Sequence, residues 1–239
     1  ANDGYEDGDP VASDEVTIVN TPPTIEELAI IADPDGWFNE LGTLIADVDA
    51  MDLDDDEIIY DYTWFVNGVE IDPDGDRLGG DYFDRGDSVW VTVTASDDEE
   101  TGETATSEVV VIGNAPPVFA DMHIEPENPL TTDELNVVID VGDADGDDIA
   151  LSYAWIVDGV PIDWEENFVP PFVTEKHQTW HVAVTADDGM GTRARTVAED
   201  EVTIENTPPI VHEFAETLVV FGVEYSANIH AVDPDRDRI

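Results

Sequence analysis

The chain has 239 residues, enough for one large domain or two ordinary ones. Its 59 acidic side chains against 7 lysines and arginines give a formal net charge of −52, which excludes nucleic acids and anionic membranes as partners because both would repel it. Hydrophobic residues still make up 41% of the chain, enough to fill packed cores, and the lack of cysteine excludes disulfides and thiolate metal sites. No apolar run approaches the ~18 residues of a membrane span, so direct membrane insertion is not expected.

The sequence repeats itself with a period of roughly 92 residues. An Asn-x-Pro-Pro motif starts at Asn20 and Asn206 and recurs as Asn114-Ala115-Pro116-Pro117; an Asp-x-Asp-x-Asp motif starts at Asp52, Asp143 and Asp233; a Tyr-x-Trp motif starts at Tyr62 and Tyr153. Because three independent markers share one order and one spacing, they predict tandem copies of one structural unit.

These markers divide the chain into four segments. The expected segments are 1–20, the last strand of a preceding repeat; 21–113 and 114–205, two complete Ig-like repeats; and 206–239, the opening strands of a following repeat. The first assignment rests on the similarity of Val16-Thr17-Ile18 to Val202-Thr203-Ile204. We therefore expect the chain to be a window on a longer array.

Within each repeat, hydrophobic residues alternate with polar ones, and a period of two predicts strands rather than helices. In the first repeat the alternation runs through 58–66, reaches a two-residue hairpin turn at Asn67-Gly68 and resumes at 89–93. The second repeat follows the same order, with its turn at Asp158-Gly159. Short strands, regular turns and one mid-repeat tryptophan predict an all-β fold of tandem seven-strand antiparallel Ig-like β-sandwiches with no helix.

The order of these motifs resembles the Ig-like, PKD-like and cadherin-like repeats of bacterial surface and secreted proteins, and the second repeat is similar to a form found in large myxobacterial-type surface proteins. The resemblance covers essentially the whole chain and implies tandem extracellular sandwiches, often stabilised by calcium, in stalks, adhesins and fibres. Many members of this group bridge strands B and F with a cysteine pair. Here Val137 and Val182 occupy those places, so the second repeat is expected to rely on packing or metal instead.

Acidic loops are the candidate metal sites. In a seven-strand sandwich the loops after strands B and F lie at the pole where the chain enters, so each repeat gathers carboxylates and a linker amide there. The predicted ligands are Asp52, Asp54, Asp56, Asp97, Asp98 and Asn20 in the first repeat, Asp143, Asp145, Asp147, Asp187, Asp188 and Asn114 in the second, and Asp233, Asp235, Asp237 and Asn206 in the third.

The chemistry of these loops favours Ca²⁺, which accepts six to eight oxygen ligands, whereas Mg²⁺ demands a small octahedron and Zn²⁺ prefers His and Cys. The loops are not EF-hands, because Asp148 and Ala154 stand at the usual glycine and glutamate positions. The alternative is a solvated acidic surface adapted to salt, since Asp also favours turns. Recurrence of the same aspartates in three copies favours metal binding.

Other candidates are weaker. Asp72, Asp74 and Asp76 do not recur in the second repeat and fit a solvated turn better than a second metal site. His177 and His181 are four apart, which is not a facing pair on a strand. Trp64 and Trp155 are expected in the cores, while Trp37, Phe38 and Trp164 are candidates for packing between units or for ligand contact. Nothing recurrent pairs the carboxylates with a nucleophile, so an enzyme is not expected.

Three functions are compatible with this sequence. The first is an extracellular structural array, a stalk or fibre component stiffened by Ca²⁺ in the acidic loops at the inter-domain junctions. The second is an adhesin or carbohydrate-binding module array, and the third is a set of accessory repeats of a secreted hydrolase. The expected partners are neighbouring repeats, other copies in a filament, or a surface ligand. An extracellular or cell-surface location follows because such loops bind calcium at ~10⁻⁴–10⁻³ M.

Overall fold

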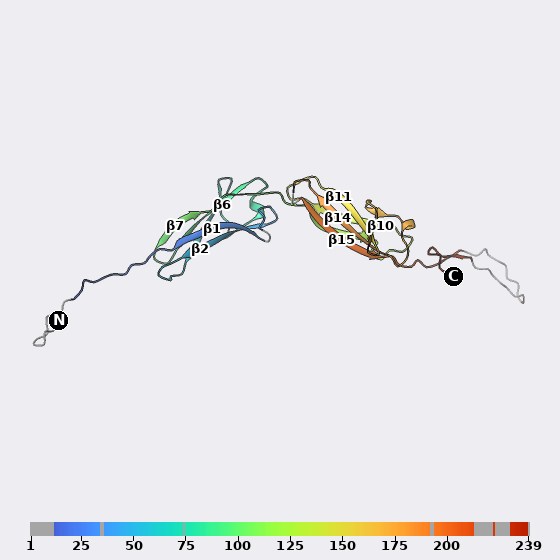
Figure 1. Cartoon of the computed structure of the whole chain (residues 1–239), viewed down its shortest axis with the longest axis horizontal. Helices are drawn as coiled ribbons and strands as arrows, with labels where there is room; N and C mark the ends of the chain where they lie inside the picture. Colours follow the sequence, from blue (N-terminus) through green and yellow to red (C-terminus); the bar gives the residue numbers. More distant parts are fainter. Residues whose placement is uncertain are drawn as a thin grey trace, which may run out of the picture. The chain divides into compact units, whose positions relative to one another are not determined.

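The computed structural model describes residues 12–33, 36–73, 75–191, 194–212, 222 and 230–238. The chain divides into two compact units, Ala1–Gly113 and Asn114–Ile239. Both are built from antiparallel strands (Figure 1).

The first unit is a sandwich of two sheets. Its strands are β1 (Thr24–Asp33), β2 (Thr43–Met51), β3 (Ile59–Val66), β4 (Val69–Ile71), β5 (Arg77–Gly79), β6 (Ser88–Ser96), β7 (Thr101–Thr106) and β8 (Val110–Val111). One sheet has the order β1-β2-β5, and the other has the order β4-β3-β6-β7 with β8 also paired to β6. Since β7 and β8 both follow β6 along one edge, they act as one interrupted strand, and the unit has the seven strand positions that the sequence predicts.

The second unit repeats this topology. Its strands are β9 (Val118–Glu125), β10 (Leu135–Gly142), β11 (Ala150–Val157), β12 (Val160–Pro161), β13 (Phe168–Val169), β14 (Thr179–Asp187) and β15 (Arg195–Thr203). They form one sheet of order β13-β10-β9 and another of order β12-β11-β14-β15. A short hairpin of β16 (Ile210–Val211) and β17 (Ala231–Val232) follows.

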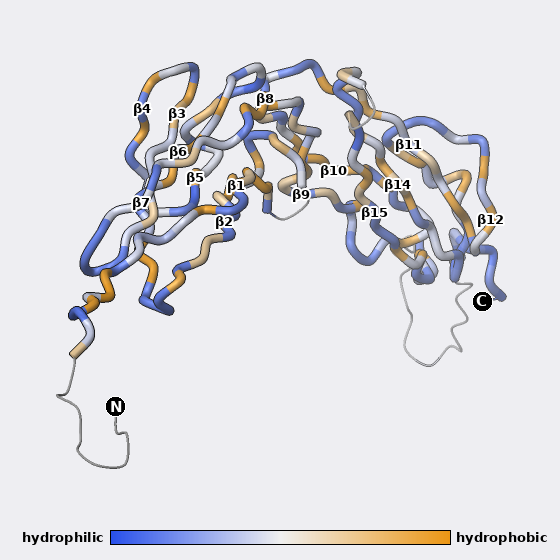
Figure 2. Tube along the Cα trace, turned by 60° about the vertical axis from the view of Figure 1, so that its left-hand side comes forward, coloured by the Kyte–Doolittle hydropathy of each residue, from blue (hydrophilic) through white to orange (hydrophobic). Residues whose placement is uncertain are grey.

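Alternation along the strands explains the sandwich, because successive side chains point to opposite faces of a sheet. On β6 every second residue is fully buried, with Val89, Val91 and Val93 at 0% exposure, and the corresponding residues of β14 are buried in the same way. Figure 2 shows hydrophobic and hydrophilic positions interleaved along the strands, with mostly hydrophilic turns at their ends. One face of each sheet therefore lines a core and the other faces solvent.

Each unit has its own core, built around the predicted mid-repeat tryptophan. Trp64 is fully buried in the first core, and Trp155 packs edge-on against Trp180 in the second. Val137 on β10 and Val182 on β14 both belong to the second core. Apolar packing thus fills the positions where the resemblance implies a cysteine pair in relatives.

The hairpin turns also agree with the prediction. Asn67 and Gly68 have φ of 51° and 81°, and Asp158 and Gly159 have φ of 49° and 79°, the positive values that a type I′ turn requires. Among the described residues the only helical segments are two three-residue 3₁₀ turns, η1 (Gly80–Tyr82) and η2 (Pro171–Val173). The prediction of an all-β, tandem Ig-like sandwich fold is confirmed. The described part of the chain has no helix with the length and apolar character of a membrane span.

Candidate metal centre

The three Asp-x-Asp-x-Asp loops adopt the same backbone conformation. The fourth residue of each loop is Asp55, Gly146 or Arg236, and each has a positive φ, at 64°, 74° and 62°. A left-handed residue is uncommon outside glycine, so its recurrence at one loop position marks a shared turn rather than a chance arrangement.

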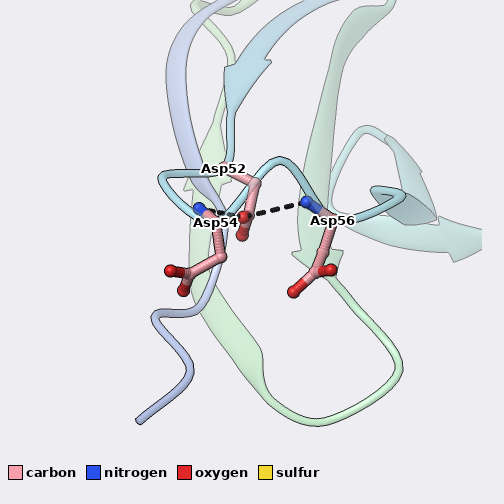
Figure 3. A group of neighbouring side chains, drawn as sticks. All are labelled: Asp52, Asp54 and Asp56. Atoms are coloured by element: carbon pink, nitrogen blue, oxygen red, sulfur yellow. Dashed lines mark hydrogen bonds between the residues drawn. The ribbon is translucent and has the colours of Figure 1, made fainter. Parts of the chain in front are cut away.

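The first aspartate of each loop holds that turn together. Oδ1 of Asp52 accepts hydrogen bonds from the backbone N–H of Asp54 at 2.7 Å and of Asp56 at 3.2 Å (Figure 3). The third loop has the same pair of bonds from Asp235 and Asp237 to Asp233, at 2.9 and 3.1 Å. In the second loop, Oδ1 of Asp143 accepts from Asp147 at 3.3 Å.

The middle aspartate of each loop fixes the linker that enters the repeat. Its Oδ2 accepts a hydrogen bond from the backbone N–H of the residue after the linker asparagine. The three bonds are Thr21 to Asp54 at 2.7 Å, Ala115 to Asp145 at 2.8 Å and Thr207 to Asp235 at 2.6 Å. Because the same bond occurs three times, the link between acidic loop and linker is a property of the repeat.

The three carboxylates of each loop converge. Each aspartate offers one oxygen, and within a loop these oxygens all lie within 4.8 Å of one another. Two ligands bound to one Ca²⁺ at about 2.4 Å can be at most about 4.8 Å apart, so this spacing is compatible with a single cation among the three. Figure 3 shows this arrangement in the first loop, with the side chain of Asp52 between those of Asp54 and Asp56.

In the first two loops, the second oxygen of the aspartate that holds the turn is buried without a hydrogen bond. These atoms are Oδ2 of Asp52 and Oδ2 of Asp143. A buried carboxylate oxygen without a partner is costly, because it has lost its water and gained nothing in return. The donor set therefore fits a cation, which would satisfy both oxygens.

The negative charges of the first loop also repel one another. Desolvation, and next the negative charge of Asp52, raise the pKa of the Asp56 carboxyl above its ordinary value. Both causes act against the ionised form, as expected for carboxylates gathered without a counter-charge. A bound cation would reverse this balance.

A second aspartate contact ties the linker asparagine to the sandwich. The amide nitrogen of Asn20 donates to Oδ2 of Asp97 at 2.9 Å, and that of Asn114 donates to Oδ2 of Asp188 at 2.8 Å. The hydrogen bond from Asn20 is the main reason that the pKa of Asp97 lies below its ordinary value. This hydrogen bond does not use the amide oxygen of Asn20, which is the atom that could bind a cation.

The remaining predicted ligands lie outside the converging groups. Asp98 is exposed. Asp187 accepts from the backbone of Gly189 at 2.9 Å and from the side chain of Arg195, and these two bonds, in that order, lower its pKa. The structural equivalent of Asp97 is thus Asp188, because both bind the linker asparagine. Asn206 donates to Thr207 at 3.3 Å.

The third loop meets the second sandwich directly. The ammonium of Lys176 pairs with Oδ1 of Asp237, and the hydroxyl of Thr131 donates to Oδ1 of Asp235. Neither residue was a candidate from the sequence. The available signal was that Lys176 is the only lysine in the chain.

The weaker candidates do not form a second site among the described residues. Asp74 lies outside the described residues, as does Ile239 after the third loop. His177 lies in a turn with φ of 67°, and His181 on β14 is 3.6 Å from Glu199.

The aromatic candidates Phe38 and Trp164 pack against the cores of their own units. The indole N–H of Trp164 donates a hydrogen bond to the backbone oxygen of Phe168 at 2.7 Å. Trp37 is half-buried.

Comparisons with known proteins give a fold and no closer relationship. No protein-family model and no curated protein matches the chain. Among solved structures, the chicken interferon gamma receptor alpha chain is 13% identical, with 78% of this chain and 100% of that chain covered and a TM-score of 0.46. A 1.5-MDa bacterial ice-binding adhesin is 15% identical, with 81% and 70% covered and a TM-score of 0.33.

A third similar structure is a Ca²⁺-stabilised, ice-binding adhesin of an Antarctic bacterium, 13% identical, with 79% of this chain and 52% of that one covered and a TM-score of 0.33. The neighbours are tandem domains of the immunoglobulin and fibronectin kinds together with bacterial adhesin repeats. The finer resemblance to PKD-like, cadherin-like and myxobacterial-type repeats stays a prediction.

Proposed function

We propose that this chain is part of an extracellular structural repeat array, a stalk or fibre component, whose acidic loops bind Ca²⁺ where the chain enters each repeat. The observation that carries the proposal is the pair of buried carboxylate oxygens without partners, Oδ2 of Asp52 and Oδ2 of Asp143, each within a converging group of three aspartates. The repetition of this group supports a structural ion rather than a single catalytic site.

The donor set favours calcium over other cations. Every candidate ligand is an oxygen of an aspartate carboxylate or of a linker asparagine amide, and the loop is an irregular turn. Ca²⁺ accepts six to eight such ligands in flexible geometry, and water can complete its shell. When bound, the ion would supply two positive charges to each group. In a chain of net charge −52, this neutralisation favours the compact state.

The same loops would make calcium a stiffener of the array. Asp145 holds the amide of Ala115, and Asp188 holds the side chain of Asn114, so loop and linker already share hydrogen bonds within the second unit. Ordering the loop with an ion would therefore order the linker as well. The following prolines, Pro116 and Pro117, restrict the backbone further. A linker fixed at one end has less freedom to swing.

The flanking segments support an array. Val16 and Ile18 are 84% and 90% exposed, whereas the matching Val202 and Ile204 are 6% and 0% exposed because they complete a sandwich. We propose that residues 1–20 are the last strand of a preceding repeat. Residues 206–239 carry a third linker and a third acidic loop in the same conformation, and we propose that they open a following repeat.

An extracellular or cell-surface location follows from the affinity of such sites. Loops of this type in extracellular modules bind calcium at about 10⁻⁴–10⁻³ M, too weakly to be filled in cytosol. Calcium binding to the folded state adds about 2.7 kcal/mol to the free energy of unfolding when the calcium concentration is 100-fold above the Kd. For a sandwich of this size, this gain raises Tm by on the order of 10 °C.

The test is a calcium titration of the full chain after EDTA treatment, read by differential scanning calorimetry and small-angle X-ray scattering. We expect calcium to raise Tm and to lengthen the particle. Asp143→Asn should remove the calcium-dependent rise in Tm of the second unit. Asp140→Asn, an equal charge change at an exposed position of β10, should leave that rise in Tm unchanged. If sodium chloride at matched ionic strength reproduces the effect of calcium, the loops are only an acidic surface.

A further inference from the structure

Lys176 lies in a turn at the pole where the chain leaves the second sandwich. The turn, residues 175–178, connects η2 to β14. It is held by the hydrogen bond from the backbone N–H of His177 to the carbonyl oxygen of Ile204 at 2.7 Å. Ile204 directly precedes the segment that leads to the third acidic loop. The lysine is therefore placed beside the outgoing chain.

The surface around Lys176 contacts that loop at several points. Its ammonium pairs with Asp237 and lies 3.5 Å from Oδ1 of Asn206. Thr131, which precedes β10, shares a hydrogen bond of 2.7 Å with Thr207 and donates a second to Asp235. We call Thr131 and Lys176 the docking surface. It contacts both the linker and the acidic loop of the segment that follows the sandwich.

Charge complementarity at this contact is pronounced. The hydrogen bond to Asp237, and then the negative charges of Asp237, Asp235 and Asp233, outweigh desolvation and raise the pKa of Lys176 above its ordinary value. The side chain of Lys176 is 28% exposed, so the pair is partly shielded from water. The chain has only seven lysines and arginines against 59 acidic residues, and one of these seven cations lies at this contact.

The first sandwich has a cation at the equivalent position. Arg85 precedes Gly86, whose backbone N–H donates to the carbonyl oxygen of Ile112 at 2.8 Å, as His177 does to Ile204. The two turns therefore have the same place in the two sandwiches. A positively charged side chain in this turn is a shared feature of both repeats.

We propose that the docking surface seats the acidic loop of the repeat that follows, with the ammonium of Lys176 as a built-in counter-charge that holds Asp233–Asp237 without metal. The partner is a neighbouring repeat of the same chain, and this rests on the proposed function only in taking 206–239 as the start of one. Calcium and lysine then compete for Asp237, because two cations held at one carboxylate repel each other. The third loop is expected to bind calcium more weakly than the first two.

The single lysine allows a direct test on the full chain in EDTA. A sample labelled with ¹³C and ¹⁵N in lysine gives one lysine side-chain signal by NMR. We expect Asp237→Asn to shift that signal, to increase the mobility of the side chain, and to speed hydrogen exchange of residues 230–238 by tenfold or more. Asp140→Asn makes the same charge change elsewhere in the unit and should have none of these three effects. The reversal Lys176→Asp with Asp237→Lys should restore the slow exchange.

The proposal is overturned if Asp237→Asn behaves like Asp140→Asn, or if the charge reversal exchanges as fast as Lys176→Asp alone. A second arm adds calcium chloride to the labelled wild type. Calcium should move the lysine signal toward its position in Asp237→Asn, at concentrations several-fold above those that stabilise the first sandwich. If calcium has no effect anywhere, the calcium proposal fails, while the result in EDTA still decides the docking surface.

Discussion

The amide nitrogen of Asn20 lies 2.9 Å from Oδ2 of Asp97, a residue 77 positions later in the chain. This contact joins the linker to the loop after β6, and the backbone N–H groups of Glu99 and Glu100 complete the shell of the same carboxylate at 2.8 and 2.6 Å. Asp97 is 7% exposed, so its charge is held by three donors rather than by water. The equivalent contact of Asn114 with Asp188 shows that the arrangement belongs to the repeat.

Removing the Asn20 contact should destabilise the first sandwich in a pH-dependent way. Asn20→Ala is expected to lower its Tm by on the order of 5 °C at pH 7, because a buried charge loses one donor. The pKa of Asp97 is depressed in the folded state, so the stabilisation is present above the unfolded value of 3.8 and is lost as pH falls through the folded value. Melting curves of wild type and variant should converge below pH 3.8. A constant difference down to pH 2.5 would contradict this assignment.

The two cores provide a matched pair of substitutions. Leu44 on β2 and Leu135 on β10 are both 0% exposed and hold the same place in their sandwiches. Replacing a buried leucine with alanine costs about 2–5 kcal/mol, through the lost burial of apolar surface and the cavity left behind. We expect Leu44→Ala to destabilise only the first unit and Leu135→Ala only the second. Differential scanning calorimetry and urea unfolding measure the stability of each unit. A loss of stability in both units in either variant would show that the cores are not separate.

Much of the fold could be predicted from the sequence because its signals are local. The alternation at 58–66 corresponds to β3, Ile59–Val66, and the Asn67-Gly68 turn has the dihedral angles that this dipeptide favours. The carboxylate groups were also predictable, since residues spaced by two in a tight loop converge by local geometry. Both the strand pattern and the carboxylate groups recur along the sequence, which supported both predictions.

What could not be predicted depends on strand register and on contacts between distant segments. Asp187 was a candidate ligand, yet the pairing of β14 with β15 places Arg195 directly opposite it, and the arginine binds its carboxylate. The equivalence of Asp97 with Asp188 emerged from their asparagine partners, because neighbouring acids make the sequence alignment ambiguous by one residue. The role of Lys176 depends on where the outgoing chain returns.

A histidine on the outer face of the second sandwich should make its stability depend on pH near neutrality. His123 on β9 lies 2.9 Å from Asp121 and 3.4 Å from Glu125, its neighbours at two residues on either side. The hydrogen bond to Glu125 contributes most to raising the pKa of His123 above 6.5. The stabilisation is therefore complete below pH 6.5 and lost as pH rises through the folded value.

The measurement is the Tm of the second unit between pH 5.5 and 8.5 for wild type and His123→Gln. The variant should be less stable than wild type at pH 5.5, by a few degrees for an exposed pair, and equal to it at pH 8.5. A variant that is equally stable at both ends of this range would show that the two carboxylates do not hold the imidazolium.

The opposing effects at Asp56 give the sharpest test of the metal sites. Desolvation and the charge of Asp52 raise the pKa of Asp56, so its ionised form destabilises the folded state above the unfolded value of 3.8, and this penalty is relieved as pH falls through the folded value. Asp56→Asn removes the charge with little change in shape. In EDTA at pH 7 the variant should therefore be more stable than wild type, by a few degrees in Tm.

In saturating calcium the order should reverse, because wild type gains a bound ion that the variant binds poorly. Asp47→Asn is the matched control: an exposed aspartate on β2 in the same unit, with the same change of charge. It should alter Tm in EDTA and in calcium by the same small amount. A crossover confined to Asp56→Asn would assign both the repulsion and its relief to the loop. Parallel shifts in the two variants would mean that calcium acts only through the net charge of −52.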